Sequence, residues 1–157
     1  KEAPIDPAPI PAAPATPLKA SLKNVTIEVM IISEVPKGVT DLKDYVQFYN
    51  NGDSYGSIIG KPNEFKTIVY GGKKVKWKGK KFNTIKKPKI KLIKKEKGGD
   101  FLDWKGSDKP NSDDEIELNV KNKDAVKDKT DIKYSIAIEI NGILDTIDPV
   151  LEYHKED

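Results

Sequence analysis

The sequence contains no cysteine, no arginine and a single histidine, His154. Without cysteine the chain cannot form disulfides, thiolate metal sites, a cysteine nucleophile or a thioether-linked haem. It also lacks any run of about 18 apolar residues, so no segment is expected to form a membrane-spanning helix. These absences exclude several classes of redox protein, metalloprotein and integral membrane protein.

The scarcity of histidine also argues against catalysis. No nucleophile elbow, phosphate-binding loop or Ser-His-Asp order accompanies His154, which lies near the carboxyl end. Two carboxylates for glycoside hydrolysis could occur by chance, but a 17.5 kDa sandwich offers little room for a deep cleft. We therefore expect a non-enzymatic protein without a cofactor.

The size and the first residue suggest a single exported domain. The chain has 157 residues, of which 36% are hydrophobic, and this fits one core. It begins with Lys1 rather than Met, as a mature product or a trimmed chain would, and its lack of cysteine suits an oxidising compartment. We expect a periplasmic, cell-surface or extracellular location.

The first organised feature is a proline-rich segment, Ala3 to Pro17, within an arm that we assign to residues 1–20. Its prolines alternate with small residues, and because proline fixes φ and lacks an amide donor, the segment should stay extended. One interpretation is a tether between a membrane anchor or cleavage site and the domain, which we assign to residues 21–157. The other is an arm that docks on a partner subunit through Ile5 and Ile10, two aliphatic side chains that a spacer would not need.

From Leu22 onward the hydrophobic period is two, which is the period of a strand. Alternation is clearest in Val25 to Ile31 and in Ile132 to Ile140, and glycine-containing turns separate the runs. This spacing predicts an all-β fold, a single antiparallel β-sandwich of about eight or nine strands with an immunoglobulin-like or cupredoxin-like architecture and no metal.

Two hairpins follow from the turn residues. Phe65 to Trp77 places two alternating runs around Gly71-Gly72, and Ile132 to Ile147 places two around Asn141-Gly142, with Pro149 ending the last run. The segment Phe65 to Trp77 resembles the hairpin of cupredoxin-like sandwiches, in which a Val-x-Trp strand precedes the metal loops. A blue-copper site requires a cysteine and two histidines, which this chain lacks. The resemblance therefore concerns architecture only, and a copper site is excluded.

The charge is strongly polarised along the chain. Residues 73–97 contain thirteen lysines and one glutamate, a net +12, whereas residues 1–72 and 98–157 sum to −1 and −8. Alternation with apolar residues predicts a lysine-covered sheet face, which would either remain solvated and block edge-to-edge aggregation or bind a polyanion. Its members are Lys74, Lys76, Lys78, Lys87, Lys89 and Lys91.

Specific nucleic-acid recognition is not expected of this face. Bidentate base and phosphate contacts favour arginine, which is absent, and single-strand binding needs exposed aromatics among the charges. Trp77 and Phe82 are instead in phase with buried positions. An anionic envelope polymer, or the acidic half of a neighbouring copy, is the partner that the charge pattern favours.

Three further features of the sequence are candidates for chemistry. Asp108, Asp113 and Asp114 lie in an oxygen-rich loop that could hold calcium but lacks the EF-hand spacing, so a solvated loop is preferred. Asp145, Asp148 and His154 form a second polar group near the carboxyl end, for which a solvent-facing role is preferred over metal ligation. Trp104 follows a Gly-Gly turn and is either an exposed loop aromatic or part of the core.

Together these features predict a structural or protein-interaction module in an envelope or extracellular assembly, with the arm docking on another subunit, which could be a second copy of the chain. The alternative is a secreted binding module for an anionic or carbohydrate polymer that uses the lysine-rich face.

Overall fold

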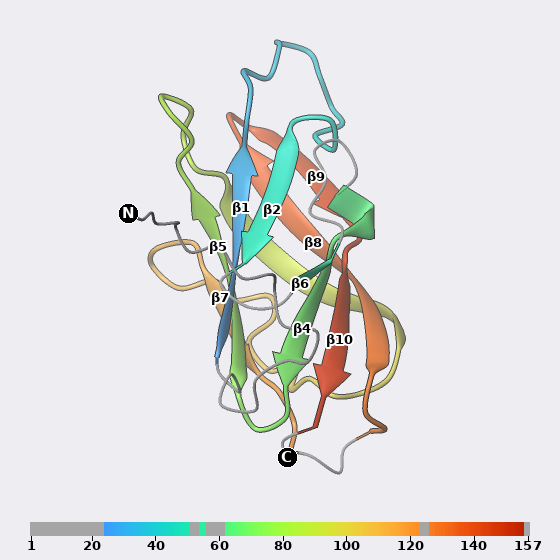
Figure 1. Cartoon of the computed structure of the whole chain (residues 1–157). Coiled ribbons are helices and arrows are strands. Elements are labelled where there is room, and N and C mark those ends of the chain that lie inside the picture. Colours follow the sequence, from blue (N-terminus) through green and yellow to red (C-terminus); the bar gives the residue numbers. More distant parts are fainter. Residues whose placement is uncertain (1–23, 51–53, 56–61, 123–125, 156–157) are drawn as a thin grey trace, which may run out of the picture.

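A computed structural model of the chain describes residues 24–50, 54–55, 62–122 and 126–155. Within these residues the chain forms ten strands, one short 3-10 helix and no α-helix, which confirms the all-β prediction (Figure 1). Ile5, Ile10 and the rest of the arm lie outside the described residues. The elements are β1 (Val25–Ile31), β2 (Val46–Asn50), β3 (Ser54–Tyr55), η2 (Pro62–Glu64), β4 (Lys66–Tyr70), β5 (Lys74–Lys80), β6 (Lys89–Gly98), β7 (Ile116–Asn119), β8 (Thr130–Ile140), β9 (Ile143–Ile147) and β10 (Val150–His154).

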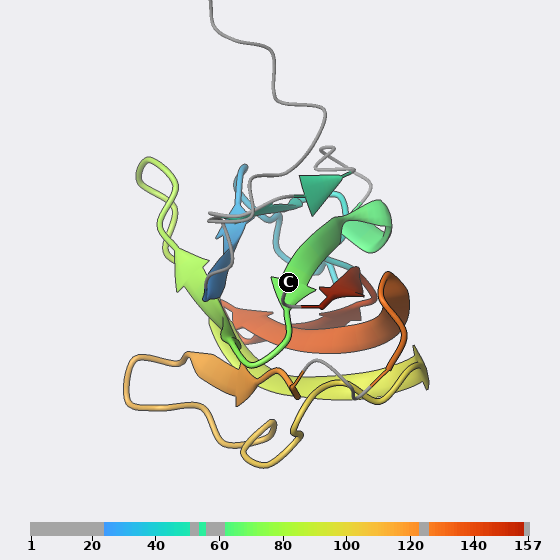
Figure 2. The same ribbon diagram turned by 60° about the horizontal axis from the view of Figure 1, so that its bottom comes forward.

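The strands form two sheets. The smaller sheet has the order β2-β1-β5-β7, and the larger has the order β3-β4-β10-β8-β6 with β9 also paired to β8. Figure 2 shows β6 and β8 as long curved ribbons that lie side by side. β9 and β10 both pair with β8, at its carboxyl-terminal and amino-terminal halves respectively, and Pro149 lies between them.

Period-two burial builds the core between the sheets. In β1 the burial pattern alternates strictly, with Val25, Ile27, Val29 and Ile31 all buried. Trp77 is fully buried on β5, as the lysines on either side of it predicted. The two sheets therefore share one apolar core, which is the main source of stability for a fold of this kind.

Aromatic pairs tie the two sheets together across this core. Phe48 of β2 stacks on Phe65, just before β4, with ring centroids 5.3 Å apart. Trp77 of β5 meets Tyr134 of β8 edge-on at 5.5 Å, and its indole Nε1 donates a hydrogen bond to the Tyr134 hydroxyl at 3.0 Å. This bond satisfies two polar groups that would otherwise be buried without a partner.

The expectation of a purely antiparallel sandwich was wrong. β1 pairs in parallel with β5, and β4 pairs in parallel with β10, while the other pairs in both sheets are antiparallel. Alternation of apolar residues specifies which face of a strand is buried. It does not specify which strand lies alongside or in which direction that strand runs, so this part of the topology was not accessible from the pattern.

The hairpin expected at Gly71-Gly72 was also wrong, because β4 and β5 belong to different sheets. The turn is closed by a hydrogen bond from the Lys73 amide to the Tyr70 carbonyl at 3.1 Å. The Gly71 amide donates to the carbonyl of His154 and the Gly72 amide to that of Val120, so the turn is bound to strand ends rather than to a hairpin ladder. The Gly-Gly pair therefore carries the chain from one sheet to the other.

The second hairpin is confirmed. β8 and β9 are antiparallel neighbours, with Ile140 opposite Ile143. Asn141 and Gly142 both have positive φ, 51° and 80°, as a two-residue turn of type I′ requires. The local sequence is sufficient to predict this hairpin, since the turn dipeptide sets both the partner strand and the register.

Candidate functional site

The structure separates the six lysines that were expected to share one face. Lys74, Lys76 and Lys78 lie on β5 in the smaller sheet, whereas Lys89 and Lys91 lie on β6 in the larger sheet. Lys87 precedes β6, and its Nζ donates to the Asp113 carbonyl at 3.4 Å. The lysine-rich stretch of sequence therefore supplies two separate surfaces.

The outer face of β5 is matched by acidic side chains on its neighbours. The distance from the lysine Nζ to the glutamate Oε1 is 3.9 Å for Lys74 and Glu117, 3.8 Å for Lys76 and Glu115, and 3.6 Å for Lys80 and Glu28. On β6, Lys91 lies 3.7 Å from Glu139. Such exposed pairs contribute little to stability, but they neutralise much of the positive charge that a polyanion would need.

The loop that follows β6 turns back along the free edge of that strand. The Ile93 amide donates to the Ser107 carbonyl at 2.9 Å, and the Ile90 amide donates to the Asp114 carbonyl at 3.2 Å. Because the loop occupies these amides, this edge of β6 is protected from pairing with a strand of another chain. Beside this covered edge the loop and the strand leave an open groove.

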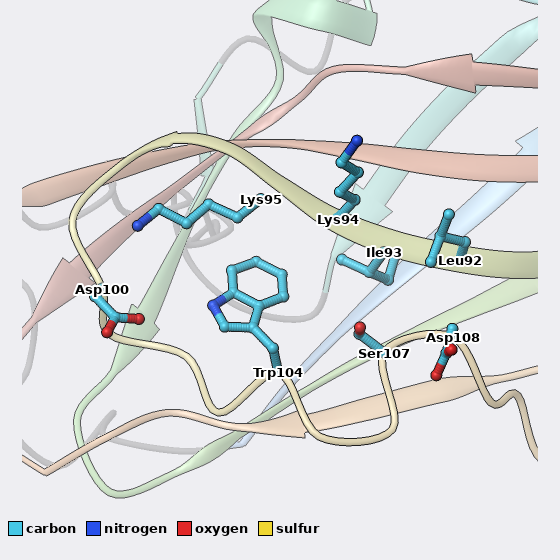
Figure 3. Close-up of a pocket in the computed structure, with 8 residues that line it drawn as sticks. All are labelled: Leu92, Ile93, Lys94, Lys95, Asp100, Trp104, Ser107 and Asp108. Carbon is cyan, nitrogen blue, oxygen red and sulfur yellow. The ribbon is translucent and has the colours of Figure 1, made fainter.

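The groove has a volume of about 610 Å³ and is drawn in Figure 3. Trp104 stands in it, with its ring facing β6, and the walls carry both apolar and charged side chains. Trp104 is half-buried and packs against the main core, so its two expected roles, core packing and surface aromatic, are combined in one side chain. The lining residues are Leu92, Ile93, Lys94, Lys95, Asp100, Trp104, Ser107 and Asp108.

The polar groups around Trp104 are unevenly satisfied. Its indole Nε1 is buried and points toward Asp100, but among the described residues it has no hydrogen-bond partner within ordinary geometry (Figure 3). Asp100 instead accepts a hydrogen bond from Lys121 Nζ at 3.0 Å. That bond lowers the pKa of Asp100, against a smaller opposing effect of desolvation, and the nearby charge of Lys95 adds to the lowering. Asp100 is thus held as a carboxylate on the rim of the groove.

A second polar cluster, which the sequence reasoning missed, lies on the outer face of the larger sheet. His154 Nε2 and Glu152 Oε2 are 2.6 Å apart, and Lys66 Nζ lies 3.3 Å from Glu152 and 3.2 Å from Asp131. The alternation of Glu152 and His154 with the buried Leu151 and Tyr153 was the available signal that they share a face.

The pKa shifts in this cluster follow from burial and from these three contacts. Burial opposes both charges, but hydrogen bonds from His154 and Lys66 lower the pKa of Glu152, and hydrogen bonds to Asp131 and Glu152 raise the pKa of Lys66. The cluster is self-contained, because each charged group already has an oppositely charged neighbour. It has the character of a structural network on a strand face.

The acidic loop is organised by its asparagine. Asn111 Oδ1 accepts hydrogen bonds from the amides of Asp113 and Glu115, at 2.9 and 3.0 Å. Nowhere in the described part of the chain do three or more His, Cys, Asp or Glu side chains form a group that could hold a metal ion. Asp108, Asp113 and Asp114 are therefore not brought together as a calcium site.

The group Asp145, Asp148 and His154 is also dispersed. Asp145 Oδ2 accepts a hydrogen bond from the Leu42 amide at 2.8 Å, which fastens the segment after β1 to β9. The Asp148 amide donates to Asn63 Oδ1 at 2.9 Å, and His154 belongs to the Glu152 cluster. The hydrogen bonds of Asp145 and Asp148 therefore hold loops in place.

The comparisons with known proteins bear on the fold. No protein-family model matches the sequence, and no curated protein sequence matches it. The structure is similar to the crystal structure of an inclusion body protein (PixA) from Burkholderia cenocepacia, with a TM-score of 0.55 and 11% sequence identity over 88% of this chain and 99% of that chain. At that identity the similarity concerns the fold alone. No helix of the described residues is long and apolar enough to cross a membrane.

Proposed function

We propose that the protein is a non-enzymatic structural module that associates with other subunits, including copies of itself, in an envelope or extracellular assembly. The observation that carries this proposal is the open groove at Trp104. An aromatic ring beside aliphatic side chains, with charged side chains at the rim, is the arrangement of a protein-recognition surface. The groove is open rather than deep, which suits an extended segment better than a small substrate.

The occupant that we propose is the proline-rich arm, Ala3 to Pro17, of a neighbouring copy. Twenty-three residues precede the first described residue, and this arm is rich in proline. A proline-fixed backbone loses little entropy on docking, and proline-rich segments bind aromatic-lined grooves. Ile5 and Ile10 would supply the apolar anchors, and Asp6 between them would face Lys94 or Lys95.

The structural neighbour is named an inclusion body protein. We carry that description to this chain as part of the proposal, since the two share a fold. An exported location belongs to the same proposal and has the lack of cysteine as its support. Within the fold, the two-sheet arrangement is expected to act as an immunoglobulin-like scaffold that presents the groove and the arm.

Self-association can be tested on the full chain by size-exclusion chromatography with light scattering over a range of concentrations. We expect the molar mass to rise with concentration and to stay at the monomer value in the Ile5→Ser/Ile10→Ser variant. Leu144→Ser is the matched control, because Leu144 is an aliphatic side chain that is 61% exposed on another surface. A monomer at every concentration, or equal association of the two variants, would contradict the proposal.

Binding of an anionic or carbohydrate polymer is the second proposed function. The net charge of +12 over residues 73–97, which the salt bridges of Lys74, Lys76, Lys80 and Lys91 neutralise only in part, favours it. The Lys74, Lys76, Lys89 and Lys91 quadruple glutamine variant should fold normally and elute from a heparin column at lower salt than the unmodified chain. Equal retention of the two proteins at low salt would leave these lysines as a solvated surface only.

A further inference from the structure

A small hollow on the outer face of the larger sheet lies apart from the Trp104 groove. It has a volume of about 270 Å³ and is lined by Lys97, Gly98, Asp131, Lys133 and Val150. Gly98 has a φ of 115°, and a Cβ there would meet the Asp131 carbonyl oxygen at 2.3 Å. The glycine therefore lets β6 approach β8 closely at this point, and the two lysines flank the hollow.

Lys97 and Lys133 lie directly opposite each other on β6 and β8. Like charges in opposed cross-strand positions are destabilising. A register shift between Lys95 and Lys97 produces this arrangement, because Lys95 pairs with Tyr134 and the next pair is Lys97 with Lys133. In a regular ladder Glu96 would stand opposite Lys133, so the bulge replaces an attractive pair by a repulsive one.

The carboxylate that lines the hollow, Asp131, does not resolve this repulsion. Asp131 is bound to Lys66 at 3.2 Å, and Lys66 is bound in turn to Glu152. Lys133 Nζ donates to the Asn63 carbonyl at 3.4 Å. Among the described residues the Lys97 and Lys133 side chains form no salt bridge, in contrast to those of Lys74, Lys76 and Lys91.

We propose that this hollow binds a tetrahedral oxyanion, a phosphate or sulfate group, that is either free or carried on a polymer. Lysine acts on such a group as a point charge with rotatable donors, so two lysines on opposite strands can bind it from two sides. Bulges are enriched beside functional sites because they re-aim side chains, and this bulge aims Lys97 at the hollow. The anion supplies the counter-charge that the strands themselves lack.

The test is a titration of the full chain with inorganic phosphate, followed by the amide NMR signals of Gly98 and Lys133 at constant ionic strength, with chloride as the reference anion. We expect saturable shifts with phosphate and none with chloride. The Lys97→Gln/Lys133→Gln variant should bind about tenfold or more weakly, since it loses charge-assisted hydrogen bonds. Lys43→Gln/Lys80→Gln removes the same charge from two salt-bridged lysines outside any proposed binding surface, whose Nζ atoms lie 3.8 Å from Asp41 and 3.6 Å from Glu28, and should bind as the unmodified chain does.

Equal weakening in both glutamine variants, or shifts that chloride reproduces, would reduce the effect to general screening and overturn the proposal. Lys97→Glu provides a second readout, because it restores an attractive pair with Lys133. Its thermal midpoint should be equal to or above that of the unmodified chain, while phosphate should no longer raise it. A lower midpoint in Lys97→Glu would show that the pair is not repulsive. Competition between phosphate and heparin at Gly98 would assign the group to a polymer, and phosphate shifts without heparin shifts would assign it to a free anion.

Discussion

The contact between Trp77 and Tyr134 allows the packing of the two sheets to be tested quantitatively. Both side chains are fully buried, and each is the hydrogen-bond partner of the other, at 3.0 Å. Burial raises the pKa of the Tyr134 hydroxyl, against a smaller opposing effect of the bond from Trp77, so the hydroxyl stays protonated. Because one residue lies on β5 and the other on β8, any loss at this contact is a loss of inter-sheet packing.

Trp77→Ala should lower the free energy of unfolding by about 3 to 5 kcal/mol, through lost burial and the cavity that remains. The orphaned Tyr134 hydroxyl places the loss toward the upper end, since an unsatisfied buried group costs about 1 to 3 kcal/mol. Whole domains are stable by only about 5 to 15 kcal/mol, so the effect should be obvious in a urea titration followed by circular dichroism.

A double-mutant cycle separates the hydrogen bond from the packing. Trp77→Phe leaves the Tyr134 hydroxyl without its donor, and Tyr134→Phe leaves the indole N–H without its acceptor. The double variant removes both polar groups, so it should be less destabilised than the sum of the single variants by about 1 to 2 kcal/mol. Additive losses would refute the bond, and an unchanged midpoint in Trp77→Ala would mean that the buried phase of β5 is reversed.

Three other predictions can be checked with thermal or chemical unfolding. Burial opposes the charge of Glu152, but its hydrogen bonds with His154 and Lys66 outweigh burial and lower its pKa below the ordinary value of 4.5. The stabilising effect of Glu152 should therefore be present above that pH and lost as the pH falls through the native pKa, and Glu152→Gln should flatten this part of the pH profile; an unchanged profile would contradict it. Gly79→Ala should lower the free energy of unfolding by about 1 to 3 kcal/mol, because the new Cβ would lie 2.0 Å from the Pro88 carbonyl oxygen. A neutral result would contradict that close approach. Lys74→Gln/Lys76→Gln should shift the midpoint very little, since its salt bridges are solvent-exposed, and a large shift would show that this surface is structural.

Local patterns predicted the strands and their buried faces well. The alternation of Val25 to Ile31, the inward side chain of Trp77 and the Asn141-Gly142 turn all depend on neighbours in sequence, and the structure reproduces each of them. The Gly71-Gly72 pair has the same local appearance but connects two sheets, because its amides are bound by the ends of distant strands. Glycine permits a tight turn, and the packing of the sheets decides what the turn connects.

The surfaces were harder to predict because they depend on strand order and on bulges. The lysines of β5 were expected to form a solvated or polyanion-binding face. Pairing with β1 and β7 instead brings Glu28, Glu117 and, just before β7, Glu115 beside lysines of this strand. The lysines at the hollow were not singled out, because a single inserted residue in β6 determines which side chain opposes Lys133. No period in the sequence reveals such a shift.

Photo-cross-linking of the full chain tests the central claim, that the arm of one copy occupies the Trp104 groove of another. A photoreactive benzoylphenylalanine at position 10 is irradiated in a mixture of isotope-labelled and unlabelled chains, and the same residue at position 144 serves as the control. We predict cross-links between labelled and unlabelled chains that join position 10 to the peptides containing Leu92 to Lys95 or Asp100 to Asp108, and none to these peptides from position 144. Cross-links from position 10 that lie elsewhere on the surface, or that form only within one chain, would contradict the account.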